Sequence, residues 1–218
     1  MAFVDLSHIV EEGMITYQGL PAPIICDFLS REASKQHYAE GTTFQIGKIE
    51  MVSNTGTYLD TPFHRFADGK DLSQIDLPSL ANLDAVLIRI PPTTSQRAID
   101  RPAFENLPLR HKAVLIHTGW SRHWRTDQYF TGHPFLTASA AAYLKDQSPT
   151  LVGIDSLNID DTADGARPVH TTLLGAGILI VEHLCNLDQL PTSAFRFTAV
   201  PVKVKGMSTF PVRAFATL

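Results

Sequence analysis

A short stretch of the chain, residues 54–64, concentrates side chains that can do chemistry. Gly56 permits a tight backbone turn, and Pro62 fixes its own φ and cannot donate a sheet hydrogen bond. The stretch is therefore predicted to be a rigid, non-helical loop. Three reactive groups stand on it: the phenol of Tyr58, the carboxylate of Asp60 and the imidazole of His64.

A second group of candidates lies far along the chain, at His170 and Glu182. Together with Asp60 they would supply one imidazole and two carboxylates, a set suited to Zn, Mn or Fe(II) with open positions for water. Glu182 interrupts the apolar run of residues 177–184, and a lone buried carboxylate is costly unless it is paired or binds an ion. These residues indicate a metal site if folding brings them together.

Each candidate also has a plain structural alternative. Asp60 could brace its own turn through the backbone, as aspartate often does in loops. His64 could be a half-exposed loop histidine, and Tyr58 could only pack. His170 could begin a helix, and Glu182 could lie on an exposed strand face. Residue types and spacing leave both interpretations open.

Composition and charge narrow the class of protein. The 218 residues are 44% hydrophobic and 18% charged, which is typical of a globular chain, and one domain over 1–218 is expected. A net charge of −4 without a basic stripe argues against a nucleic-acid partner. No apolar run reaches the roughly 18 residues of a membrane span, so no membrane partner is expected. We expect a cytoplasmic chain without a signal peptide, with Cys26 and Cys185 as two buried thiols.

The pattern of apolar runs predicts an α/β fold. Short β-branched runs bounded by Pro or Gly predict buried strands over 84–92, 112–120 and 150–156. A helix is expected within 133–146, capped by Thr137 or Ser139, and residues 173–184 are expected to pass from helix to strand. Since strands and helices alternate along the chain, we predict the α/β class.

Four other segments have weaker signals. They predict an exposed loop or short helix over 30–41, a half-buried strand with a bulge over 44–54, a helix beginning at Asp100 and an exposed-face strand pair within 195–206. Apart from Asn54 at the end of 44–54, these segments carry none of the candidate residues, so they bear mainly on the fold.

The stretch 54–64 resembles the signature of the putative cyclase family, His-x-Gly-Thr-His-x-Asp-x-Pro-x-His. The matching positions are Gly56, Thr57, Asp60, Pro62 and His64. Further motifs resemble the family in the same order, at residues 5–8, 118–121, 153–155 and 170–174, then Gly177-Ile178, Glu182 and Asn186-Leu187. The family includes bacterial kynurenine formamidases and isatin hydrolases. The resemblance implies a swivelling β/α/β cyclase-like domain, metal-dependent amide hydrolysis, and a homodimer or higher homo-oligomer.

The chain departs from the signature at two positions, where Asn54 and Tyr58 replace histidines. An amide oxygen is a weak ligand for zinc, and a phenol must lose a proton with a pKa of about 10 before it binds strongly. The resemblance therefore implies a weakened first metal position, and a second one intact at Asp60, His170 and Glu182. We expect one divalent metal, Zn or Mn, and regard a second metal site as doubtful.

Three functions remain open at this point. The first is a metal-dependent hydrolase of a small cyclic or aryl amide (a formamide or lactam) or a lactone. In it His64 transfers protons and Tyr58 donates a hydrogen bond to the oxyanion. The second is a metal-free acid/base enzyme on the same fold, and the third is a non-catalytic pseudoenzyme that binds a small molecule.

Substrate contacts are expected from residues near the candidate groups. The side chains of this set are Asn54, Phe63 and Trp120, with Arg65 and Arg167 able to hold a substrate carboxylate. A small molecule is thus the expected partner.

Overall fold

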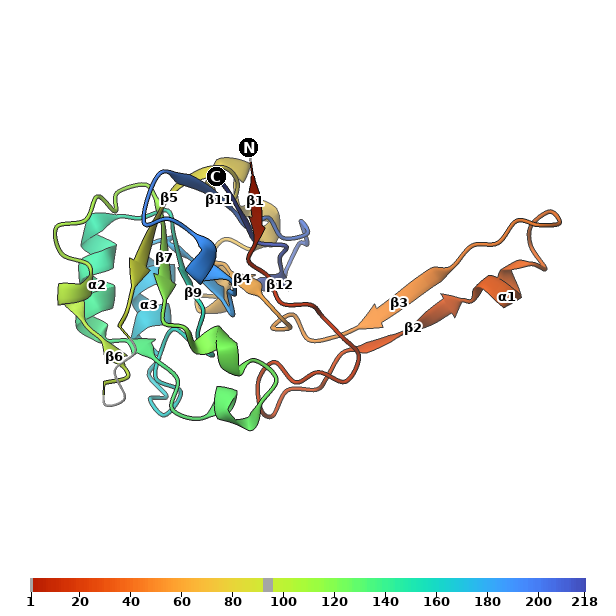
Figure 1. Cartoon of the computed structure of the whole chain (residues 1–218), viewed down its shortest axis with the longest axis horizontal. Coiled ribbons are helices and arrows are strands. Elements are labelled where there is room, and N and C mark those ends of the chain that lie inside the picture. Colours follow the sequence, from red (N-terminus) through yellow and green to blue (C-terminus); the bar gives the residue numbers. More distant parts are fainter. Residues whose placement is uncertain (1, 92–95) are drawn as a thin grey trace.

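A mixed sheet forms the centre of the computed structural model, which describes residues 2–91 and 96–218 (Figure 1). Its nine strands run in the order β1-β13-β11-β5-β7-β9-β10-β4-β12. The central strands are parallel: β5 (Leu83–Arg89), β7 (Ala113–His117), β9 (Leu151–Ile154) and β10 (Leu179–Glu182). Antiparallel strands extend both edges: β1 (Phe3–Asp5), β13 (Phe215–Thr217), β11 (Phe195–Thr198), β4 (Tyr58–Asp60) and β12 (Thr209–Pro211).

Side-chain alternation along the parallel strands builds a core on each face of the sheet. On β7, for example, Val114 and Ile116 belong to one buried cluster, while Leu115 belongs to the other. The first cluster packs under α2 (Ala138–Gln147) and α3 (Pro168–Gly175). The three strands predicted as buried on both faces and the α/β class are thereby confirmed. Pro92, the last residue of the first predicted strand, lies outside the described residues.

The helix predictions are confirmed where capping residues are present. Thr137 begins α2 and its side chain accepts a hydrogen bond from the Ala140 N–H. The run 173–184 does pass from α3 to β10. Asp100 starts only the short 3-10 turn η4 (Arg101–Ala103), so the predicted helix there is wrong in length. Residues 195–206 contain the single strand β11, whose partners are β5 and β13, so the predicted pair is wrong.

A long two-stranded arm projects from the body (Figure 1). It consists of β2 (Ile24–Leu29), the short helix α1 (Arg31–Ser34) and β3 (Ile46–Glu50), with a register shift between Asp27 and Leu29. Every residue of β3 is exposed, because no further layer covers the arm, so the prediction of a half-buried strand is wrong. Cys26 is also exposed on the arm, whereas Cys185 is buried as expected.

Among the described residues, the helices are too short or too polar to cross a membrane.

Candidate metal-binding active site

The candidate residues are brought together by strand register. Tyr58 and Asp60 point to the same face of β4, because side chains alternate along a strand. In the antiparallel pairing with β10, Tyr58 lies opposite Glu182. On the other side of β4, Thr209 of β12 lies opposite Asp60. Cross-strand neighbours share a face, so these four side chains form one polar group on the sheet.

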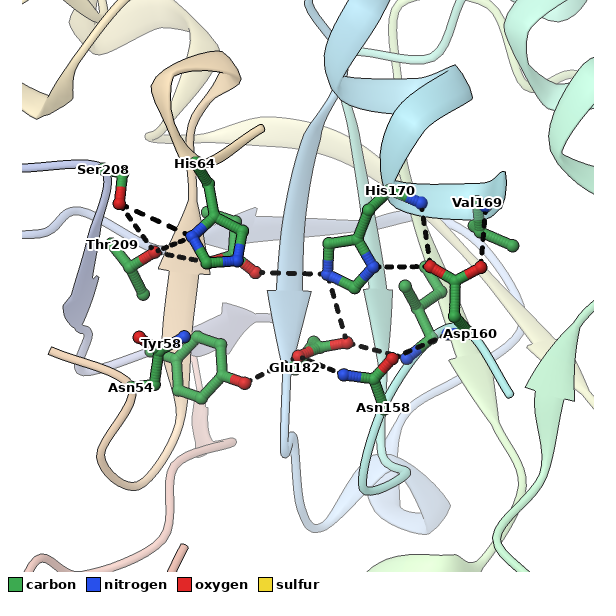
Figure 2. Close-up of polar contacts among 12 residues, drawn as sticks. Asn54, Tyr58, His64, Asn158, Asp160, Val169, His170, Glu182, Ser208 and Thr209 are labelled. Atoms are coloured by element: carbon green, nitrogen blue, oxygen red, sulfur yellow. Dashed lines mark hydrogen bonds and ion pairs between the residues drawn. The ribbon is translucent and has the colours of Figure 1, made fainter. Parts of the chain in front are cut away.

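His170 is supplied by the first turn of α3 and is held there by Asp160 (Figure 2). The Asp160 carboxylate accepts hydrogen bonds from the Val169 N–H (2.7 Å) and the His170 N–H (3.0 Å), and it lies 2.6 Å from His170 Nδ1. An Nδ1–H donated to Asp160 leaves the Nε2 lone pair free, the usual arrangement of a metal-binding histidine. His170 Nε2 faces Asp60 Oδ2 and Glu182 Oε1, each at 3.7 Å.

The Asp60 carboxylate is fully buried, and only one of its two oxygens accepts a hydrogen bond from the described residues. Its Oδ1 accepts a hydrogen bond from the Thr209 hydroxyl at 2.6 Å, while its Oδ2 has no hydrogen-bond partner within the described part of the chain. Burial acts to raise its pKa, but the neighbouring His170 and His64 imidazoles outweigh burial and hold the pKa below its ordinary value. An ionised, buried oxygen without a partner is costly unless a cation faces it.

Glu182 is buried and oriented by two short hydrogen bonds. The Tyr58 hydroxyl donates to Oε2 at 2.7 Å, and the Ile159 N–H donates to Oε1 at 2.7 Å. Asn158 Nδ2 makes a longer contact with Oε2. Burial raises the pKa of Glu182 to about 7. Glu182 is therefore a buried, hydrogen-bonded carboxylate within the apolar run, and the alternative that it lies on an exposed strand face is excluded.

Tyr58 remains a neutral phenol in this setting. Burial, followed by the charges of Glu182 and Asp60, raises the pKa of Tyr58 well above its ordinary value. Its single hydroxyl proton is donated to Glu182, so it is not free for an oxyanion in this arrangement.

His64 stands at the more open side of the site, with 34% of its side chain exposed. Thr209 Oγ1 lies 3.1 Å from His64 Nδ1 and donates its only proton to the Asp60 carboxylate. Since the hydroxyl proton is already used, His64 Nδ1 must be the donor in its contact with Thr209. This relay fixes the tautomer and leaves His64 Nε2 as a proton acceptor.

The donor set fits a divalent cation. Three buried carboxylates, those of Asp60, Asp160 and Glu182, lie within 4.0 Å of the His170 imidazole nitrogens. Burial would lower the pKa of His170, but its contacts with Asp160 and Asp60 overcome burial and raise the pKa to about 10. The buried carboxylates thus favour a positive charge on the His170 imidazole. Ligand atoms of Asp60, His64 and His170 lie within 4.8 Å of one another, and Glu182 Oε1 is 3.7 Å from His170 Nε2. A divalent ion held at this group would balance the excess negative charge.

A cavity of about 520 Å³ opens over the site. Its lining includes Asn54, Tyr58, His64, Asn158, His170, Glu182, Arg65, Arg167 and residues 17–20. Of the three expected substrate contacts, only Asn54 belongs to this lining. Phe63 lies outside it, and Trp120 lines a different cavity, where its indole N–H donates to the Tyr129 carbonyl at 3.0 Å.

Sequence reasoning missed three contributors to the site. Thr209 gave no local signal, because its role depends on β12 pairing with β4. Asn158 was not singled out either. Asp160 is the third: its carboxylate accepts from the Val169 N–H and contacts His170 Nδ1, and the sequence did not predict that contact. An aspartate shortly before a candidate histidine ligand was the available signal.

Fold and site together define an α/β protein with a buried acid–imidazole centre that could hold a metal ion. Residues 4–161 match the family model described as Putative cyclase, which is more than half of the chain. The chain belongs to this family, as its motifs predicted.

Curated relatives cover nearly the whole chain. A kynurenine formamidase of Bacillus mycoides (strain KBAB4) is 27% identical over 97% of this chain and 95% of the relative. A kynurenine formamidase of Geobacillus thermodenitrificans (strain NG80-2) is 26% identical with the same coverage.

Solved structures support the same fold. One is described as a potential metal-dependent hydrolase with cyclase activity. It superposes with a TM-score of 0.79 at 26% identity, covering 99% of this chain and 96% of that one. Isatin hydrolase A from Labrenzia aggregata, bound to benzyl benzoate, gives 0.81 at 21% identity, covering 99% and 93%. The expected cyclase-like fold is confirmed.

Proposed function

We propose that this chain is a metal-dependent hydrolase of a small aryl or cyclic amide, such as a formamide or lactam, or of a lactone. One divalent ion, Zn or Mn, would be held by Asp60, His170 and Glu182. The observation that carries the proposal is the buried Asp60 Oδ2, which has no hydrogen-bond partner among the described residues and faces His170 Nε2, on a ring fixed by Asp160. The relatives named kynurenine formamidase and the neighbour named metal-dependent hydrolase support it.

A second metal ion beside Tyr58 is not part of this proposal. The phenol stays protonated and donates to Glu182, so it offers no anionic ligand. Asn54 adds only an amide oxygen. We propose instead that Tyr58 orients Glu182, in place of the oxyanion role expected from the sequence.

His64 is the proposed proton-transfer group. A bound divalent ion supplies Lewis acidity and lowers the pKa of a water toward 7. His64 Nε2, left as an acceptor by the Thr209 relay, takes a proton as water attacks the substrate carbonyl. The same nitrogen returns that proton to the leaving amine. Asn54, at the cavity wall, is the proposed substrate contact.

A metal-free acid/base enzyme has one observation in its favour. The raised pKa of His170, about 10, would let an imidazolium balance part of the carboxylate charge without any ion. In such an enzyme a chelator would leave turnover unchanged.

Metal content and turnover test the proposal together. We expect protein purified without added metal to contain one divalent ion per chain and to hydrolyse members of a panel of formamides, lactams and lactones. Asp60→Asn and His170→Ala should lose the ion and at least about a thousandfold in kcat/KM. The exposed Asp68 provides a matched control, Asp68→Asn, which should keep both. Survival of metal and activity in the first two variants would place the site elsewhere.

We further propose that a second copy of this chain covers the arm, giving a homodimer. The arm exposes Ile24, Phe28, Ile46 and Ile49 to solvent. An isolated two-stranded ribbon is at best marginally stable in water, so an unpaired arm needs another surface.

We keep the expectations of one functional domain over 1–218 and of a cytoplasmic location.

Light scattering after gel filtration tests the dimer. Phe28→Asp combined with Ile49→Asp should convert a dimer into a monomer. The control is Leu77→Asp, which adds the same charge at a body residue that is 64% exposed. A wild-type monomer at micromolar concentration would refute the dimer.

A further inference from the structure

The cavity over the site carries opposite charges at two depths. Its buried floor holds Glu182 and His170, next to Asp60. Arg65 and Arg167 line the same cavity at more exposed positions. The proposed proton transfer uses neither arginine. A reaction centre at depth, with positive charge toward the solvent, favours a ligand with a negatively charged end.

Arg65 is oriented without its charge being neutralised. Its Nε donates to Thr171 Oγ1 at 3.1 Å, and its guanidinium carbon lies 5.5 Å from the centre of the Phe66 ring. Within the described part of the chain, its two terminal NH₂ groups make no hydrogen bond. These groups are the paired donors that bind a carboxylate side by side.

Arg167 is held at the cavity against its local backbone preference. It precedes α3 with a φ of +48°, in the left-handed region that residues with a Cβ seldom adopt. Its Nη1 donates to the Asp161 carbonyl at 3.1 Å, and its Nη2 donates to the Tyr17 hydroxyl at 3.3 Å. Both acceptors are neutral, so the positive charge remains available.

No carboxylate of residues 2–91 and 96–218 lies within 4.0 Å of either arginine's nitrogens. Arg125, by contrast, is 2.7 Å from Glu11. Thr171 also links the two cavity arginines. Its hydroxyl accepts from Arg65, and its N–H donates to the Arg167 carbonyl at 3.0 Å. The two unneutralised charges therefore belong to the same side of the cavity.

We propose that the substrate carries a carboxylate away from its scissile amide bond, and that Arg65 and Arg167 bind this carboxylate and determine specificity. The guanidinium fork matches a carboxylate with two parallel hydrogen bonds. The inference rests on the proposed hydrolase function, which places the scissile bond at the cavity floor. The preferred class is a carboxylated aryl amide over its neutral counterpart.

Two isosteric substrates, in which the charged or neutral group lies across the ring from the formamide, test the charge alone: 4-formamidobenzoate and 4-formamidobenzamide. Wild-type protein should favour the carboxylate in kcat/KM, chiefly through a lower KM. Arg65→Gln and Arg167→Gln should each reduce this preference by about tenfold or more, because each removes a charged hydrogen-bond donor. Arg196→Gln, at an exposed arginine paired with Asp84, should retain it.

Two readouts separate this inference from the hydrolase proposal. Equal hydrolysis of both substrates by wild-type protein, or an unchanged preference in both glutamine variants, would overturn the inference and leave the hydrolase standing. If neither substrate is hydrolysed, calorimetry with 4-aminobenzoate and 4-aminobenzamide decides. Carboxylate-selective binding that is lost in the variants would support the inference without the hydrolase, whereas binding that the variants retain would refute it.

Discussion

The active-site end of the sheet and the projecting arm differ in what surrounds their side chains. At the site, polar side chains are held by partners from other elements, as when Tyr58 of β4 donates to Glu182 of β10. On the arm, apolar side chains such as Phe28 and Ile49 meet solvent. The comparison shows that the candidate reactive side chains lie where contacts from several elements fix their positions. The arm, by contrast, has an apolar surface that another molecule could contact.

The largest difference between the two regions is expected when the same amount of apolar side chain is removed from each. Leu59→Ala empties a fully buried position of β4 and should lower the free energy of unfolding by about 2–5 kcal/mol. Ile49→Ala on the arm should change it by no more than about 0.5 kcal/mol. Urea unfolding at a concentration where the chain is monomeric measures both. A large cost for Ile49→Ala would mean that another surface of the chain covers the arm.

A smaller effect is expected from the residue that fixes His170. Asp160→Asn removes the charge beside His170 Nδ1 and should weaken metal binding about 10- to 100-fold. Metal titration against a competing chelator measures this affinity. Asp161→Asn changes the adjacent carboxylate, which does not contact His170, and should leave the affinity unaltered. Equal metal affinities in both variants would mean that Asp160 does not contribute to metal binding.

The smallest of these effects concerns the relay to His64. Thr209→Val keeps the shape but removes the hydroxyl between Asp60 and His64, and should lower kcat about tenfold. Thr209→Ser restores the hydroxyl and should recover most of the activity. Steady-state kinetics on one substrate compares all three proteins. A valine variant as active as wild type would mean that His64 needs no such positioning.

Local signals were sufficient for much of the fold. Apolar runs bounded by Pro or Gly predicted β5, β7 and β9, and Thr137 predicted the start of α2. Exposure on the arm could not be predicted, because the pattern of 44–54 shows alternation but not whether any layer covers it. The strand pair expected in 195–206 failed for a related reason, since the partners of β11 come from distant segments.

The site was predictable where a residue type is costly to bury. Glu182 interrupts an apolar run, and Asp60 lies in a segment that was predicted to be a rigid loop but forms strand β4; each lies 3.7 Å from His170, where two distant segments meet. Thr209 could not be found this way, because a threonine in a strand is ordinary and its importance comes from register alone. Trp120 shows the opposite case. It belongs to a motif that resembles the family and was expected to contact the substrate, but it lines a different cavity.

The pairing of β1 with β13 has a consequence for how the molecule is made. Residues 3–5 are synthesised before their sheet partners, residues 215–217, and before Thr209. While the chain is being made, β1 therefore stays without its partner strand, and the hydroxyl that aligns His64 is still missing. This part of the sheet can form only after residues 215–217 have been synthesised, and such long-range contacts form slowly.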